Sequence, residues 1–127
     1  MTAMQRRKGQ SGELEVCGLI RDLTGWDVKR KVRNHAHDFD LEGIPGWAPE
    51  VKRHATASRA DIRAWWVQAE AQAGMLLPVL FYRANRGDWR AVWPLAVALS
   101  MQRADMWRGH EWTCETTVEA WATVARA

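Results

Sequence analysis

Apolar positions near the start of the chain recur with the period of a helix. They fall on one face at i, i+3, i+4 and i+7, namely at Val16, Leu19, Ile20 and Leu23. The pattern predicts a helix from about Ser11 to Thr24, with Gly25 as its stop. Glu13 lies on this apolar face, where an unpaired charge would be costly to bury. Taken alone, Glu13 is best explained as a first-turn acid that the helix dipole stabilises.

Between residues 26 and 53 the spacing changes to the period of two that is typical of strands. Three strands are predicted, at Trp26–Val32, His37–Leu41 and Trp47–Arg53. The first alternates apolar and basic residues, and the second places Asp38 and Asp40 on one face. A Gly-Ile-Pro-Gly turn at 43–46 precedes the third strand, so we expect a three-stranded meander.

A second helix and an apolar hairpin follow. Ser58 and Asp61 form a capping box that starts the helix, and Gly74 ends it. Its apolar stripe consists of Ile62, Trp65, Trp66, Ala69 and Ala73. This helix is expected to cross over to Leu76–Tyr82, an apolar run typical of a strand covered on both faces. Trp89–Trp93 is the hairpin partner of that run.

Helical patterns at Leu95–Arg103 and Thr116–Ala125 complete the chain. The predicted order is α-β-β-β-α-β-β-α, an α/β fold with a mixed sheet flanked by helices. With 127 residues, 47% of them apolar, the chain is expected to form one domain. Its core would cover about 6–95, and 96–127 would be a C-terminal helical extension.

Cysteine usage and hydropathy limit the class of protein. Cys17 and Cys114 are far apart and form no CxxC pair, which excludes a zinc knuckle and a disulfide scaffold and favours a reducing compartment. No apolar run approaches the length of about 20 residues that a bilayer requires, and no secretory signal is visible. We therefore expect a cytoplasmic protein without a membrane partner.

Charge is distributed unevenly along the chain. The formal net charge is +3, but residues 1–33 hold eight basic and four acidic side chains. This asymmetry predicts an anionic partner at the N-terminal end, and DNA-backbone contact is favoured over a merely solvated face. The candidate DNA-binding residues are Arg6, Arg7, Lys8, Lys29, Arg30, Lys31, Arg33, Arg53 and Arg59.

The strongest chemical signal is an Asp-x9-Glu-x-Lys pattern formed by Asp40, Glu50 and Lys52. Strand periodicity puts Glu50 and Lys52 on one face, and pairing of the second and third strands would bring Asp40 beside Glu50. With Glu13 approaching from the helix, such an oxygen-only cluster suits Mg²⁺ or Mn²⁺. The alternative is a surface hairpin whose charges form weak salt bridges.

At these residues the chain resembles the PD-(D/E)XK nuclease superfamily, and within it the Holliday junction resolvase-like endonucleases of archaea, viruses and phages. The resemblance covers residues 6–95, and it departs from the family pattern at Phe39, which replaces the proline before the acid. Its matching pieces are Arg7-Lys8-Gly9 with Glu13, then Asp40-Leu41, the Gly43-Ile44-Pro45-Gly46 turn, and Glu50-Val51-Lys52-Arg53.

The resemblance implies a restriction-endonuclease-like core and a role for each matching residue. Asp40, Glu50 and the Val51 backbone carbonyl would hold Mg²⁺ or Mn²⁺, with Glu13 as a helix-borne acid. Lys52 would position or activate the attacking water, and Gln68 matches an auxiliary polar position. Asp38 is a rival to Asp40 for the metal, and whether His37 assists is open.

The resemblance implies a homodimeric, metal-dependent endonuclease that cuts branched DNA in a phage or prokaryotic host cytoplasm. Two alternatives remain open at this point. One is a nuclease of the same superfamily that acts on flaps, nicks or duplex ends. The other is a non-catalytic DNA-binding module that keeps the fold. Trp65 and Trp66 could stack on bases, but their helical spacing favours the core.

Overall fold

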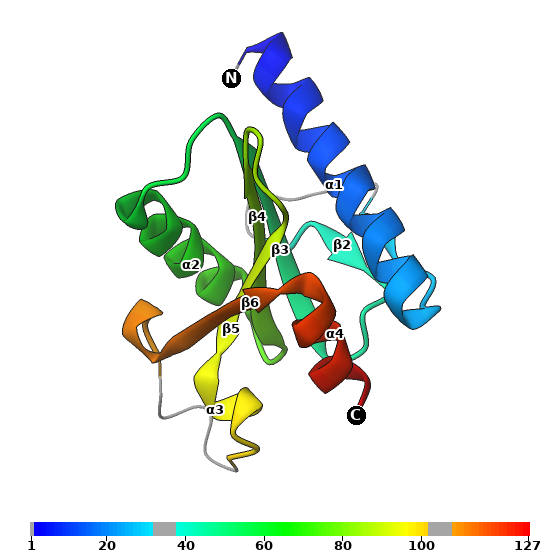
Figure 1. The fold of residues 1–127 in the computed structure, drawn as a ribbon, viewed down its shortest axis with the longest axis vertical. Coiled ribbons are helices and arrows are strands. Elements are labelled where there is room, and N and C mark those ends of the chain that lie inside the picture. The colour runs from blue at the N-terminus through cyan, green and yellow to red at the C-terminus, as the bar shows by residue number, and fades with distance from the viewer. Residues whose placement is uncertain (1, 32–37, 102–107) are drawn as a thin grey trace.

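A four-stranded mixed sheet lies between helices in the computed structural model, which describes residues 2–31, 38–101 and 108–127 (Figure 1). The elements are α1 (Ala3–Thr24), β1 (Lys29–Arg30), β2 (Leu41–Glu42), β3 (Trp47–His54), α2 (Arg59–Ala73), β4 (Leu77–Ala84), β5 (Arg90–Pro94), α3 (Leu95–Ala98), the 3₁₀ turn η2 (His110–Trp112), β6 (Thr113–Thr117) and α4 (Val118–Arg126). Within the described ranges, no helix combines the length and the apolar character needed to cross a membrane.

The sheet has the strand order β3-β4-β5-β6, so β3 is an edge strand. β3 runs parallel to β4, with Glu50 opposite Leu80, while β4–β5 and β5–β6 are antiparallel. α2 connects the two parallel strands, which confirms the predicted crossover, and its Ser58 capping box is also present. The α/β class with a mixed sheet is therefore confirmed.

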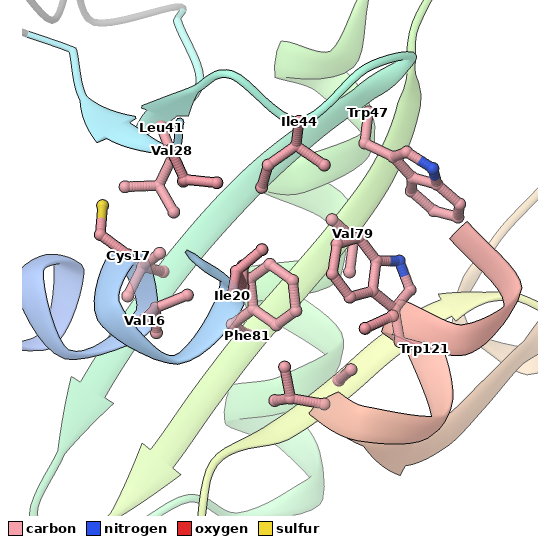
Figure 2. Close-up of a cluster of buried hydrophobic side chains, with 14 of the residues drawn as sticks. Val16, Cys17, Ile20, Val28, Leu41, Ile44, Trp47, Val79, Phe81 and Trp121 are labelled. Atoms are coloured by element: carbon pink, nitrogen blue, oxygen red, sulfur yellow. The ribbon is translucent and has the colours of Figure 1, made fainter. Parts of the chain in front are cut away.

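The two faces of the sheet are covered by different helices. α1 and α4 pack on the face that carries Val51, Val79 and Phe81, where they form the larger core (Figure 2). α2 packs on the opposite face, against Leu80 and Tyr82. Because side chains alternate along a strand, Glu50 and Lys52 project to the α2 side while Val51 projects to the α1 side.

α1 begins eight residues earlier than the apolar pattern predicts. Thr2 caps it through a capping box with Gln5, and Gly25 ends it in the left-handed conformation. The extra turns carry no apolar stripe and are largely exposed, so hydrophobic periodicity could not reveal them. The explanation of Glu13 as a first-turn acid is therefore wrong, because Glu13 lies in the middle of α1.

The predicted meander is also wrong. β1 and β2 pair with each other in a separate two-stranded sheet. Of the described residues in the predicted strand over His37–Leu41, only Leu41 lies in β2. β2 does not pair with β3 in a ladder. Pro49 on β3 has no N–H with which to continue a ladder. The main-chain N–H of Asp40, just before β2, instead donates a hydrogen bond to the carbonyl oxygen of Pro49 at 2.9 Å. Arg33, His37 and the end of the predicted first strand lie outside the described residues.

The C-terminal segment is part of the sheet and of the main core, not a helical extension. β6 pairs with β5 along Thr113–Thr117, and α4 begins only at Val118, with Thr117 as its cap. The predicted helix from Leu95 ends at Ala98. The strand was missed because the residues of β6 are mostly polar and lack an alternating apolar pattern.

Candidate active site

A cleft of about 760 Å³ runs along the outer edge of β3. One wall is the N-terminal half of α1, which passes the end of β3 (Figure 1). The helix can lie this close because Gly12 faces the strand, where an added Cβ atom would come within 3.1 Å of the Arg53 Cβ atom. The floor and far wall consist of Asp40, the second half of β3 and Gln68 from α2.

Asp40 and Glu50 meet in this cleft. The Oδ2 atom of Asp40 accepts a hydrogen bond from the Val51 N–H at 2.8 Å, which holds the carboxyl group against the edge of β3. Glu50 is 3% exposed, and its carboxyl group is within hydrogen-bonding reach of that of Asp40. The geometry therefore brings together the two acids of the Asp-x9-Glu-x-Lys pattern, although the strands do not form the expected ladder.

Burial and mutual repulsion change the acidity of both groups. Burial raises the pKa of Asp40 to about 6, and the nearby charge of Glu13 adds to the shift. Burial and the charge of Asp40 raise the pKa of Glu50 to about 8, against the opposing ammonium group of Lys52. At neutral pH the pair consequently holds one proton between its two carboxyl groups.

Three side chains surround the Glu50 carboxyl group. Lys52 Nζ lies 3.5 Å from Glu50 Oε1, and Gln68 Nε2 donates to the same oxygen at 3.2 Å. Gln72, one turn along α2, donates to Glu50 Oε2 in the amide orientation that satisfies its neighbours. Sequence reasoning did not single out Gln72, and its signal was the i, i+4 spacing from Gln68 on one helix face.

Glu13 and Asp38 approach the pair but have other direct partners. The Nε atom of Arg30 donates to Glu13 Oε2 at 2.7 Å, so the Glu13 carboxylate lines the cleft as half of an ion pair. Lys31 Nζ donates to Asp38 Oδ1 at the same distance of 2.7 Å. Of the two rival acids, Asp40 is thus the one beside Glu50.

The carboxyl pair fits a hard divalent cation. Within the described residues, no group of three or more His, Cys, Asp or Glu side chains is placed to hold a metal ion. Two carboxylates are nevertheless what Mg²⁺ commonly takes from a protein, with waters and substrate phosphates completing its shell. A proton now offsets the repulsion between the two buried acids, and a cation would offset it more fully. Asp40 and Glu50 are the side chains that would hold it.

The predicted DNA-binding residues divide into groups. Arg6, Lys8 and Arg53 line the cleft, and Arg30 reaches it through Glu13. Arg7 and Arg59 are exposed beyond its lining residues. The remaining described members pair elsewhere, Lys29 with Asp27 at 3.2 Å and Lys31 with Asp38. Much of the positive charge at the cleft therefore comes from α1.

Glu15 links α1, which forms the basic wall of the cleft, to the sheet through two ion pairs. Its carboxylate lies 2.5 Å from Arg83 Nη1 on β4 and 3.5 Å from Arg53 Nη1 on β3. The side chains are one-quarter to one-third exposed, so these ion pairs are partly shielded from solvent. They tie α1 to two strands at the level of the cleft.

In EDTA, we expect the protein to lose about 2 kcal/mol of unfolding free energy between pH 6.5 and 8.5. The raised pKa of Glu50 means that the folded protein keeps a proton that the unfolded chain has already lost, so stability falls as pH rises through about 8. Urea denaturation at both pH values measures the change. Mg²⁺ should restore more stability at pH 8.5 than at pH 6.5, and the absence of any Mg²⁺ effect at pH 8.5 would contradict the metal site.

Comparisons with known proteins do not assign a function, so the assignment depends on the cleft. The sequence matches no protein-family model, no curated protein and no solved structure.

Proposed function

We propose that the protein is a metal-dependent endonuclease that hydrolyses phosphodiester bonds in DNA. The observation that carries the proposal is the buried Asp40–Glu50 carboxyl pair, with Lys52 beside it, in a cleft whose opposite wall is basic. Two acids and an ammonium group in one cleft suit a substrate that brings negative charge to a bound cation.

The chemistry follows from the charges. A divalent cation held by Asp40 and Glu50 would polarise the phosphodiester and lower the pKa of a nearby water. The Lys52 ammonium group, 21% exposed, orients the attacking water and stabilises the negative charge that builds on the phosphate. Gln68 and Gln72 hold the Glu50 carboxyl group, and the Val51 N–H holds that of Asp40. Such positioning lowers the cost of assembling the reacting groups.

Two features of the fold support a restriction-endonuclease-like core. The acids lie on and beside the edge strand of a mixed sheet, at the start of the parallel unit β3–α2–β4. A helix from each face reaches this edge, α1 with Glu13 and α2 with Gln68. The proposed substrate is branched DNA and the proposed assembly is a homodimer, because a two-fold protein presents two sites to the two strands of a symmetric junction.

Incubation with a synthetic four-way junction, a flap and a linear duplex tests the proposal. We expect cleavage in Mg²⁺ or Mn²⁺, none in EDTA, and paired symmetric nicks in the junction. Lys52→Ala should cut at least about 100-fold more slowly, the usual cost of removing one group that stabilises transition-state charge. Arg126→Ala, which removes a cation at the far end of the chain, is the control.

Each other outcome selects a different function. Cutting of the flap or duplex alone would identify a nuclease with another substrate. Binding of DNA without cleavage in either metal would identify a non-catalytic module. Cleavage by Lys52→Ala at the wild-type rate would show that the site is assigned incorrectly.

A further inference from the structure

The row of side chains that leads away from the carboxyl pair ends in an aromatic stack. Glu50, Lys52 and His54 are every second residue of β3, so all three lie on its α2 side. Gln68 and Trp65 lie at successive turns of α2, and Gln68 bonds to Glu50. Trp65 stacks on His54, with 4.8 Å between ring centroids and 30° between planes. β3 and α2 therefore meet at two places: Gln68 bonds to Glu50, and Trp65 stacks on His54.

The stack leaves His54 available to a ligand. His54 is exposed and lines the cleft, whereas Trp65 is half-buried and packs against the α2-side core. The indole also lies 6.1 Å from the Tyr82 ring, which belongs to that core. Trp65 therefore covers one face of the imidazole, while His54 as a whole stays exposed and lines the cleft.

Charges around His54 come from both walls. Lys52 on β3 and Lys8 on α1 are close enough to act on the imidazole, with Asp61 of α2 as the opposing charge. Burial and the two lysines lower the pKa of His54, which favours the uncharged imidazole. The ring offers a flat surface for an aromatic group, and Lys8, which lines the same cleft, offers a cation for an attached anion.

A nucleotide combines those two chemical features. We propose that His54, supported by Trp65, is a stacking subsite for an unpaired base of the DNA strand, whose phosphate is bound by Lys8. The inference rests on the proposed nuclease function and narrows its substrate class to branched DNA with unpaired or splayed bases near the branch point. A base stacked inside a closed duplex cannot reach such a ring, whereas a splayed or single-stranded base can.

The spacing along β3 is suitable for one strand to use both places. His54 follows Glu50 by four residue steps along β3, or roughly 13 Å at the usual rise per residue. Stacked B-form DNA advances about 3.4 Å per nucleotide, so this span corresponds to roughly four stacked steps, and to fewer in an extended strand. The unpaired base would therefore lie a few nucleotides from the reacting phosphate.

Binding in EDTA tests the subsite without cleavage. The probes are a labelled single strand carrying 2-aminopurine and the matched duplex, with affinity measured by anisotropy and stacking by 2-aminopurine quenching. His54→Ala should weaken single-strand binding about tenfold and remove the quenching, while duplex affinity stays unchanged. His54→Phe should keep both because it keeps a ring, and His110→Ala is the matched control outside the cleft.

The subsite is refuted if His54→Ala binds the single strand as tightly as wild type, or weakens single strand and duplex equally. Loss of binding in His54→Phe as well would also refute stacking as the cause. The proposed nuclease function is judged separately, by wild-type cleavage in Mg²⁺. Cleavage without any His54 effect removes only the subsite, and a His54 effect without cleavage removes only the nuclease.

Discussion

Replacing Glu50 by glutamine should reduce metal-dependent cleavage at least about 100-fold while stabilising the metal-free protein at pH 8.5. The two effects have the same physical origin. Glu50 is 3% exposed beside a second carboxyl group, so its ionised form is costly to bury, and this is the form that a cation requires. A neutral amide of the same shape removes both the cost and the metal ligand.

Cleavage of DNA in Mg²⁺ and urea denaturation in EDTA measure the two effects on the same preparation. In Glu50→Gln, the unfolding free energy should become nearly independent of pH between 6.5 and 8.5. The raised pKa of Glu50 is the source of the stability that the wild-type protein loses over this range. Glu42→Gln, an exposed substitution on β2, should change neither property. A Glu50→Gln protein that is inactive and also less stable than wild type at pH 8.5 would contradict this account.

Replacing Trp121 by alanine should cost about 3–5 kcal/mol of unfolding free energy, the usual range for a fully buried large aromatic side chain. Trp121 is completely buried at the meeting point of α4 and the sheet (Figure 2). Its ring lies edge-on to Trp47, with centroids 5.5 Å apart, and to Phe81, with centroids 5.0 Å apart. Such aromatic pairs add about 0.5–1.5 kcal/mol each beyond area burial.

Equilibrium denaturation compares Trp121→Ala with two other variants. Trp112→Ala should cost much less, because Trp112 is 42% exposed. Trp121→Phe should retain most of the stability, because it keeps an aromatic ring and removes a buried indole N–H that has no hydrogen-bond partner among the described residues. A loss below about 1 kcal/mol in Trp121→Ala would mean that the C-terminal helix is not part of the cooperative core.

Elements with a strong local signal were predictable from the sequence. The capping box at Ser58 and the apolar stripe after it located α2, and the continuous apolar run located β4 with its hairpin partner. The spacing of Asp40, Glu50 and Lys52 also indicated three side chains that line one cleft. Each of these signals depends on residues close together in the chain, where periodicity and capping act directly.

Elements that depend on distant partners were not predictable. β6 has few apolar residues and forms because β5 offers it an edge to pair with. The first turns of α1 were missed for a different reason: they are polar and carry no apolar stripe, although the Thr2–Gln5 capping box that starts them is a local signal. Gln72 and the His54–Trp65 stack join residues that lie 11 or more positions apart on a strand and a helix.

The sequence by itself determined an α/β chain with a crossover helix and a set of acids, a lysine and basic residues suited to metal-dependent chemistry on an anionic substrate. Only the tertiary structure decided that Asp40 lies beside Glu50 at a sheet edge, held by one hydrogen bond to Pro49 and one from Val51. It also decided that Glu13 lines the cleft while paired with Arg30. The physical reason is that local periodicity sets which face a side chain occupies, whereas long-range packing sets which faces meet.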